Sequence, residues 1–240
     1  ALHPPRLSVA CNKAPSTVDN GPAVSDRSSS TRGPLRAACA AVVVASWCGC
    51  GPAIADDAAK VGAVLAVRGA VFTDSAGSMR PLAVQAPVRE RDAIVATDGK
   101  AKIALDDGTI ISVAEHTRVH ISQFRKAAQA TRTKLELVSG ALRVFVAKVA
   151  PNGHFEIETE TAIAVVRGTD WLVEALPDRT SVALLRGDVA VTGRDPRAAG
   201  SVVLQQAGQG TDVRRGAAPT APIPWGAGRL ADLLARATFN

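Results

Sequence analysis

The sequence predicts an all-β domain over residues 60–193, in which many short antiparallel strands form stacked hairpins. Apolar and polar side chains alternate along this stretch, which is the period of a half-buried strand. Turn pairs that contain glycine interrupt the alternation at short intervals, as in sheets built from hairpins. No helix-period segment lies between these runs, which argues against a parallel α/β sheet. The pattern is compatible with a sandwich or a β-solenoid-like stack.

The composition predicts one globular domain with tails, because the chain has 240 residues, of which 47% are hydrophobic and 21% charged. Aromatic residues make up only 3% and tyrosine is absent, so the core must consist mainly of aliphatic side chains. The net charge is +6, and residues 1–55 carry +3 of it. The rest is nearly balanced and has no Lys/Arg run with interleaved aromatics, so we expect no nucleic-acid binding.

The first 55 residues read as a leader. Residues 1–31 are rich in Pro, Ser, Asn and Thr and are expected to be disordered. Residues 32–55 resemble a signal peptide, with Arg32 and Arg36 before an uncharged apolar stretch and with Ala53 and Ala55 as the small residues of a cleavage site. Cleavage after Ala55 predicts a periplasmic or secreted protein without a stable membrane span. The alternative is an uncleaved inner-membrane anchor, since residues 37–55 carry no charge.

The elements of the domain follow from the alternation. Three runs show it well, namely Ala101–Ile103–Leu105, Val119–Ile121 and Leu135–Leu137, each separated by polar residues. We expect about twelve short strands on this spacing. Their turns are predicted at Asp98-Gly99, Asp107-Gly108, Asn152-Gly153, Arg167-Gly168 and Arg186-Gly187. A weak, irregular repeat places a glycine turn before an apolar strand at Gly69, Gly140 and Gly187.

After Gly193 the composition shifts. Residues 194–240 are expected to hold a linker rich in Gly, Ala, Gln and Pro, with one further strand at 201–205, and a short C-terminal helix. The helix, at 225–236, would dock on the domain through Leu230, Leu233 and Leu234. Contact with a membrane or a partner is the alternative for this helix.

No catalytic, metal or cofactor site is expected. His116 and His120 would lie on one strand face about 13 Å apart, too far to share an ion. Glu156, Glu158 and Glu160 would stand at steps of about 6.6 Å, close to the separation of glycosidase carboxylates, but a solvated strand face explains them better. All four cysteines precede residue 56, so the domain has no thiol chemistry. Trp171 is expected in the core rather than as a platform for a sugar ring.

A family resemblance rests on several motifs taken in order. The segment 155–162 runs directly into 163–173, which contains Val166-Arg167-Gly168-Thr169-Asp170-Trp171. Residues 92–97 (DAIVAT), 104–109 (ALDDGT) and 185–191 (LRGDVAV) complete the pattern. Together these segments resemble the FecR-domain family over about residues 61–193. The resemblance marks Asp107, Gly108, Thr109, Arg167, Gly168, Thr169, Asp170 and Gly187 as family signature turns.

The resemblance implies an all-β periplasmic domain that takes part in signalling. In the best-known members this domain passes a signal from an outer-membrane transporter to a cytoplasmic sigma factor, often in iron uptake. Residues 1–31 are too short and too polar for the cytoplasmic helical domain of those regulators. We therefore expect a non-enzymatic protein-interaction or signal-sensing module whose partner is an unknown envelope protein. The alternatives are a module that binds cell-wall glycan or other carbohydrate, and a membrane-anchored FecR-type regulator of sigma-factor signalling linked to iron transport.

Overall fold

The computed structural model describes residues 58–127, 130–147, 153–198 and 200–239. The expected leader and signal peptide, with Ala53 and Ala55, lie outside the described residues, and so does Asn152. All of the described residues belong to one compact unit that spans Ile54–Asn240.

Twelve strands occupy the described part of Lys60–Gly193, which confirms an all-β domain of about twelve strands. Three of them are long, because β1, β4 and β7 have 16, 13 and 16 residues. The strands are β1 (Lys60–Ser75), β2 (Ser78–Pro81), β3 (Pro87–Arg89), β4 (Ala93–Leu105), β5 (Ile110–Val113), β6 (Thr117–Ala127), β7 (Ala130–Phe145), β8 (His154–Glu158), β9 (Ala162–Val166), β10 (Asp170–Ala175), β11 (Arg179–Arg186) and β12 (Val189–Gly193).

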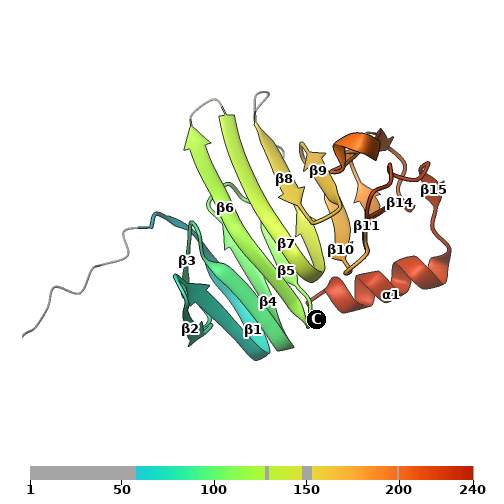
Figure 1. Cartoon of the computed structure of the whole chain (residues 1–240). Helices are drawn as coiled ribbons and strands as arrows, with labels where there is room; N and C mark the ends of the chain where they lie inside the picture. Colours follow the sequence, from blue (N-terminus) through green and yellow to red (C-terminus); the bar gives the residue numbers. More distant parts are fainter. Residues whose placement is uncertain (1–57, 128–129, 148–152, 199, 240) are drawn as a thin grey trace, which may run out of the picture. The chain divides into compact units, whose positions relative to one another are not determined.

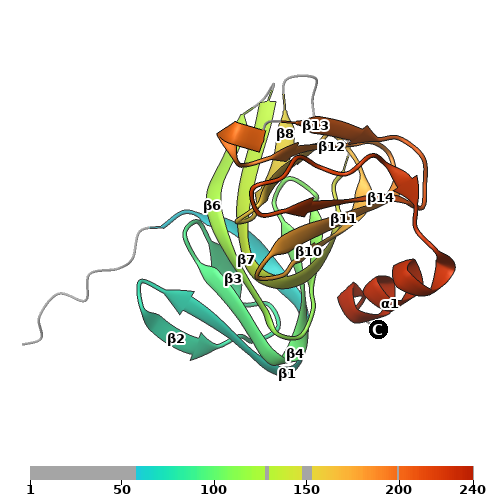
Figure 2. The same ribbon diagram turned by 45° about the vertical axis from the view of Figure 1, so that its right-hand side comes forward.

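The long strand β7 is the centre of the topology. Its first half pairs with β6 and β8, and its second half pairs with β5 and β10. From β8 the sheet continues through β9 and β12, and from β10 it continues through β11. On the other side β5 and β6 both pair with β4, which pairs with β1. The result is one continuous sheet that curls around a shared core (Figures 1 and 2).

The core follows the predicted alternation. In β7, Leu135, Leu137, Leu142 and Val144 are fully buried, while the residues between them face outward. One apolar cluster joins buried side chains from β1 through to Val213. Aliphatic residues make up most of this cluster, as the low aromatic content predicts.

Three of the glycines that were expected at turns, Gly69, Gly99 and Gly140, lie inside strands instead. Asp98-Gly99 lies within β4, where Gly99 is paired with Gly69 of β1. A Cβ on Gly69 would lie 2.3 Å from the carbonyl oxygen of Asp98, so the glycine pair allows the two backbones to approach closely. The pairing register shifts directly after Gly69. The glycines therefore do mark a local irregularity of the backbone, but it is an irregularity within a long strand pair and not a turn. Gly140 likewise lies inside β7.

The connection around Gly153 is not a hairpin. β7 and β8 pair in parallel, with Arg132 opposite His154, so the chain must cross over between them. This is the one parallel pair among the described strands, and every other printed pair is antiparallel. The prediction of stacked antiparallel hairpins therefore holds for the sheet with this single exception.

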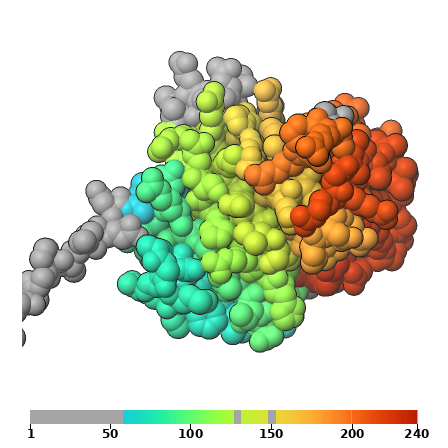
Figure 3. All heavy atoms as spheres, viewed as in Figure 1, coloured from blue at the N-terminus to red at the C-terminus, as the bar shows by residue number. Residues whose placement is uncertain are grey.

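The sheet continues beyond residue 193. A 3-10 turn, η1 (Pro196–Ala198), precedes the predicted strand, which is β13 (Ser201–Leu204) and pairs with β12. Two strands were not predicted, namely β14 (Gln209–Arg214), which pairs with β11, and β15 (Ile223–Pro224). In the view of Figure 3 the N-terminal strands and the C-terminal segment lie on opposite sides of the central strands.

The predicted C-terminal helix is α1 (Ala227–Ala237), and it docks on the outer face of the sheet. Leu233 and Ala237 are buried against Ala141 of β7, Leu172 of β10 and Ala183 of β11. Arg229 stacks on Trp225, with its guanidinium carbon 3.6 Å from the ring centre. Among the described residues no helix has the length and hydropathy that a bilayer span requires.

Candidate functional site

The signature turn 167–170 joins β9 to β10 and is held from three sides. Thr169 is buried, and its hydroxyl donates to the carbonyl of Asp188 at 2.8 Å. The amide of Val146 donates to the carbonyl of Thr169 at 2.9 Å. Gly187, at φ +96°, lies in the turn between β11 and β12, and a Cβ there would lie 2.8 Å from the carbonyl oxygen of Gly168. The two turns therefore pack directly against each other.

Asp170 is the charged end of this turn and is fully committed to Arg143 of β7. The guanidinium donates to both carboxylate oxygens, at 3.1 Å and 2.8 Å. The hydrogen bond to Asp170 raises the pKa of Arg143 further above its usual value. A bidentate pair of this kind fixes the geometry of both side chains. Asp170 thus ties the signature turn to the central strand and is not free to act as a base.

The second signature turn, Asp107 to Thr109, closes the β4–β5 hairpin. The carboxylate of Asp107 accepts from the amide of Thr109 at 2.8 Å and from the hydroxyl of Thr133 at 2.9 Å. Gly108 has φ +86°, and a Cβ there would lie 3.3 Å from Ala147, just beyond the end of β7. The turn is an Asx-type cap rather than a reactive group.

The two sets of signature residues meet at the C-terminal end of β7. Phe145 is paired with Ile110 of β5 on one side and with Asp170 of β10 on the other. Neither Phe145 nor Arg143 was predicted from the sequence as a site residue. Arg143 and Phe145 alternate with the buried Leu142 and Val144, and this alternation alone would place both side chains on the outer face.

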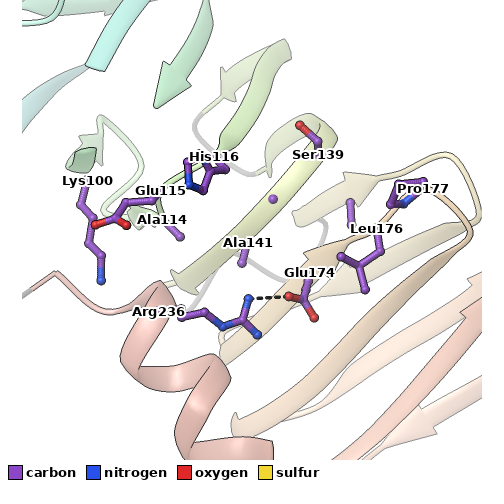
Figure 4. Close-up of a pocket in the computed structure, with 12 residues that line it drawn as sticks. Lys100, Ala114, Glu115, His116, Ser139, Ala141, Glu174, Leu176, Pro177 and Arg236 are labelled. Carbon is purple, nitrogen blue, oxygen red and sulfur yellow. Dashed lines mark hydrogen bonds and ion pairs between the residues drawn. The ribbon is translucent and has the colours of Figure 1, made fainter. Parts of the chain in front are cut away.

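A separate cavity of about 340 Å³ lies beside the C-terminal end of α1 (Figure 4). Small residues line it, including Ala114 and Ala141, which pack under α1, together with Gly140 and Ala175. Arg236 of α1 and Glu174 of β10 form an ion pair at 2.6 Å along one wall. Lys100 donates to the backbone carbonyls of Ala235 and Thr238, which end the helix. Lys100 and Arg236 both hold the helix in place, and the cavity is the space that remains where α1 passes over small side chains.

His116 lines the same cavity, and its predicted place on a strand is wrong. It was expected on a strand face with His120, but it lies in the turn before β6 and has φ +55°. His120 is within β6, where its Nε2 accepts a hydrogen bond from Arg118 Nε at 3.4 Å. In the described part of the chain, no group of three or more histidine, cysteine, aspartate or glutamate side chains could hold a metal ion.

The three glutamates do not form one carboxylate row. Glu156 and Glu158 of β8 both pair with Lys134 of β7, at 3.4 Å and 2.7 Å. The hydrogen bond that Lys134 donates to the Glu158 carboxylate raises the pKa of Lys134. Glu160 lies beyond the end of β8 and pairs with Arg215. The expected row is therefore wrong for Glu160, because β8 ends at Glu158.

Trp171 is fully buried in the core, as predicted, and so cannot stack on a sugar ring. Its indole nitrogen has no hydrogen-bond partner in the described structure. The burial of the large apolar ring stabilises the core by more than the unmade hydrogen bond of this nitrogen costs.

The fold and the turns define a curled all-β domain that is built around paired signature turns. Residues 91–190 match the family model described as FecR protein. This part of the chain is therefore a FecR domain, which confirms the resemblance seen in the sequence.

Comparisons with known proteins add little beyond the family model. Two crystal structures of a candidate anti-sigma factor from Parabacteroides distasonis ATCC 8503 are similar to this chain, at 17% identity and a TM-score of 0.47 each. Each match covers 58% of this chain and 62% of the other, so the chain spans less than two thirds of that protein. Among curated proteins none matches this chain.

Proposed function

We propose that this protein is an exported, non-enzymatic FecR-like domain that binds another protein of the cell envelope and takes part in signalling. The match of residues 91–190 to the FecR family carries the proposal. The family's known members are regulators, which supports a regulatory role over a catalytic one. The signature residues support it too, because Asp107, Thr169 and Asp170 are all engaged in holding turns together.

The export part of the proposal is tested separately. Signal peptidase would cleave after Ala55, so N-terminal sequencing of the exported protein is expected to begin at Asp56. An intact chain that stayed in the inner membrane would instead support the anchored regulator of sigma-factor signalling. A chain that remained in the cytosol would contradict export.

The binding part is tested by affinity isolation of the tagged chain from a detergent-solubilised envelope extract. The matched control is Leu142→Asp, which places a charge at a fully buried core position and unfolds the sheet. We expect one protein to co-purify in stoichiometric amount with the wild-type chain and to be absent with the control. Sedimentation of the wild-type chain with peptidoglycan, with no protein recovered, would contradict the proposal and favour a cell-wall module.

A further inference from the structure

The outer face of β5, β7 and β10 is divided into a covered and an uncovered half. The half under α1 consists of Ala114, Ala141 and Leu172, which are buried by the helix. The helix ends at Ala237, and Thr238 reaches Arg143 through a hydrogen bond at 3.4 Å. Beyond this point Thr238 and Phe239 line a hollow on this face, but no helix or strand among the described residues lies over it. Apolar side chains on the uncovered half stay exposed to solvent, and an exposed apolar patch is a typical binding site for a partner protein.

The uncovered half contains a cross-strand row of side chains. Ile110 of β5 is opposite Phe145, Phe145 is opposite Asp170, and Asp170 is opposite Arg186 of β11. Directly opposed residues share one face of a sheet, so these four side chains lie side by side. Phe145 is 44% exposed, which is unusual for the central strand of a sheet.

Two hollows flank Phe145, and both are bordered by cations. The first, of about 200 Å³, is lined by Lys102, Ile110, Arg143 and Phe145 among others. The second, of about 270 Å³, is lined by Phe145, Arg167, Thr169 and Arg186 among others. Both include Asp170, the one carboxylate that lines either hollow in the described structure, and Arg143 neutralises it.

The cations around Phe145 are available for a partner. Arg167 and Arg186 are exposed, and neither guanidinium makes a hydrogen bond or an ion pair within the described residues. Lys102 is half-buried, and its ammonium group is also unpaired there. Three unpaired positive charges around one exposed aromatic ring favour a ligand that is acidic and carries an apolar group.

The backbone that presents these groups is already fixed. Thr169 bonds the β9–β10 turn to the β11–β12 turn, and Gly187 allows the two turns to touch. Arg167 lies in one of these turns, and Arg186, the last residue of β11, directly precedes the other, so both project from backbone that is held in place. Such preorganisation lowers the entropy that binding would otherwise lose.

We propose that this surface, formed by Phe145, Ile110, Lys102, Arg167 and Arg186, docks an acidic segment of a protein partner. In that segment carboxylates would flank one large apolar side chain, which would cover Phe145. The inference rests on the proposed function and specifies the chemistry of the partner and the place where it binds.

The test is a calorimetric titration of the full chain with a blocked peptide of four acidic residues around one leucine. We expect binding that weakens about tenfold for Arg167→Gln/Arg186→Gln and that also weakens with rising salt. Phe145→Ser should weaken binding of the same peptide. It should leave unchanged the binding of a second peptide in which serine replaces the leucine. The matched controls are Arg80→Gln and Met79→Ser on the exposed strand β2, which should bind as the wild type does.

Several outcomes would overturn the inference. They are an absence of peptide binding, equal binding of a peptide whose acids are replaced by amides, and equal losses in the β2 controls. Inorganic phosphate or a polyuronate that bound as tightly as the peptide would also overturn it, because the site would then be a general anion or glycan site. If the envelope partner is captured equally by wild type and by the Arg167/Arg186 variant, this inference fails while the proposed function stands. If the peptide binds but no envelope protein is ever captured, the proposed function fails instead.

Discussion

Replacing Gly187 with alanine is expected to destabilise the domain by forcing the two signature turns apart. The residue has φ +96°, a conformation that costs alanine about 1–2 kcal/mol. The new Cβ would also lie 2.8 Å from the carbonyl oxygen of Gly168 and 2.9 Å from the hydroxyl of Thr169. Overpacking of this kind costs about 1–3 kcal/mol. We expect a total loss of about 3 kcal/mol in the free energy of unfolding.

The chain offers a control that separates the two contributions. Gly77 in the β1–β2 hairpin has φ +84° and nothing within 4 Å of the Cβ position, so Gly77→Ala carries the conformational cost alone. Urea unfolding measures the free energy of unfolding of both variants and thermal unfolding measures their Tm, each followed by circular dichroism. Gly77→Ala should lose about 1 kcal/mol and so lower Tm by about 3 °C, and Gly187→Ala should lower Tm by about 9 °C. Equal losses in the two variants would refute the claim that the turns are packed against each other.

Three further perturbations test other parts of the structure. Thr180→Val removes a buried hydroxyl that lies 2.6 Å from the hydroxyl of Thr159 and 2.7 Å from that of Thr161, and it should cost about 1–2 kcal/mol in urea unfolding, whereas Thr180→Ser should lose less than half of that. Burial raises the pKa of Asp212, but hydrogen bonds from Arg229 and Ser181 outweigh it and hold that pKa below its ordinary value. The ionised carboxylate of Asp212 therefore stabilises the fold above the pKa of the unfolded state, and this stabilisation is lost as the pH falls through the pKa of the folded state. Asp212→Asn should lower the free energy of unfolding by roughly 1 kcal/mol at pH 7 and should have no effect well below about pH 4. A loss of stability that does not change with pH would contradict this. Leu233→Ala empties a buried site under α1 and should accelerate amide hydrogen exchange in the helix before any change in β7, while equal acceleration in both would show that the helix is not a separate unit.

The strands could be predicted because the information for them is local. Alternation alone places Leu135 and Leu137 in the core and Lys134 outside, whatever the neighbouring strands are. β14 was missed because its sequence, QGTDVR, has little apolar alternation. It becomes a strand by pairing with β11 and by packing Trp225 against Gly210, where a Cβ would lie 2.1 Å from the ring.

Longer-range features could not be read from the sequence. The turn signal at Asp98-Gly99 is local, but Gly69, with which Gly99 pairs, lies thirty residues earlier, and the pair keeps the strands running through the expected turn. The bidentate contact of Arg143 with Asp170 spans 27 residues, so nothing in either local pattern reports it. The outer face beside the signature turns depends on the register of four strands, which no local pattern reports.

The sheet must lie outside the cytoplasm for an envelope partner to reach it. All four cysteines precede residue 56, so a mature chain that begins at Asp56 contains no thiol. A single cysteine placed at Met79, which is 53% exposed, can then be probed in spheroplasts with a membrane-impermeant maleimide. For an exported domain we expect complete labelling of the variant before lysis and none of the wild-type chain. Labelling of the variant only after lysis would place the domain in the cytosol and refute its export.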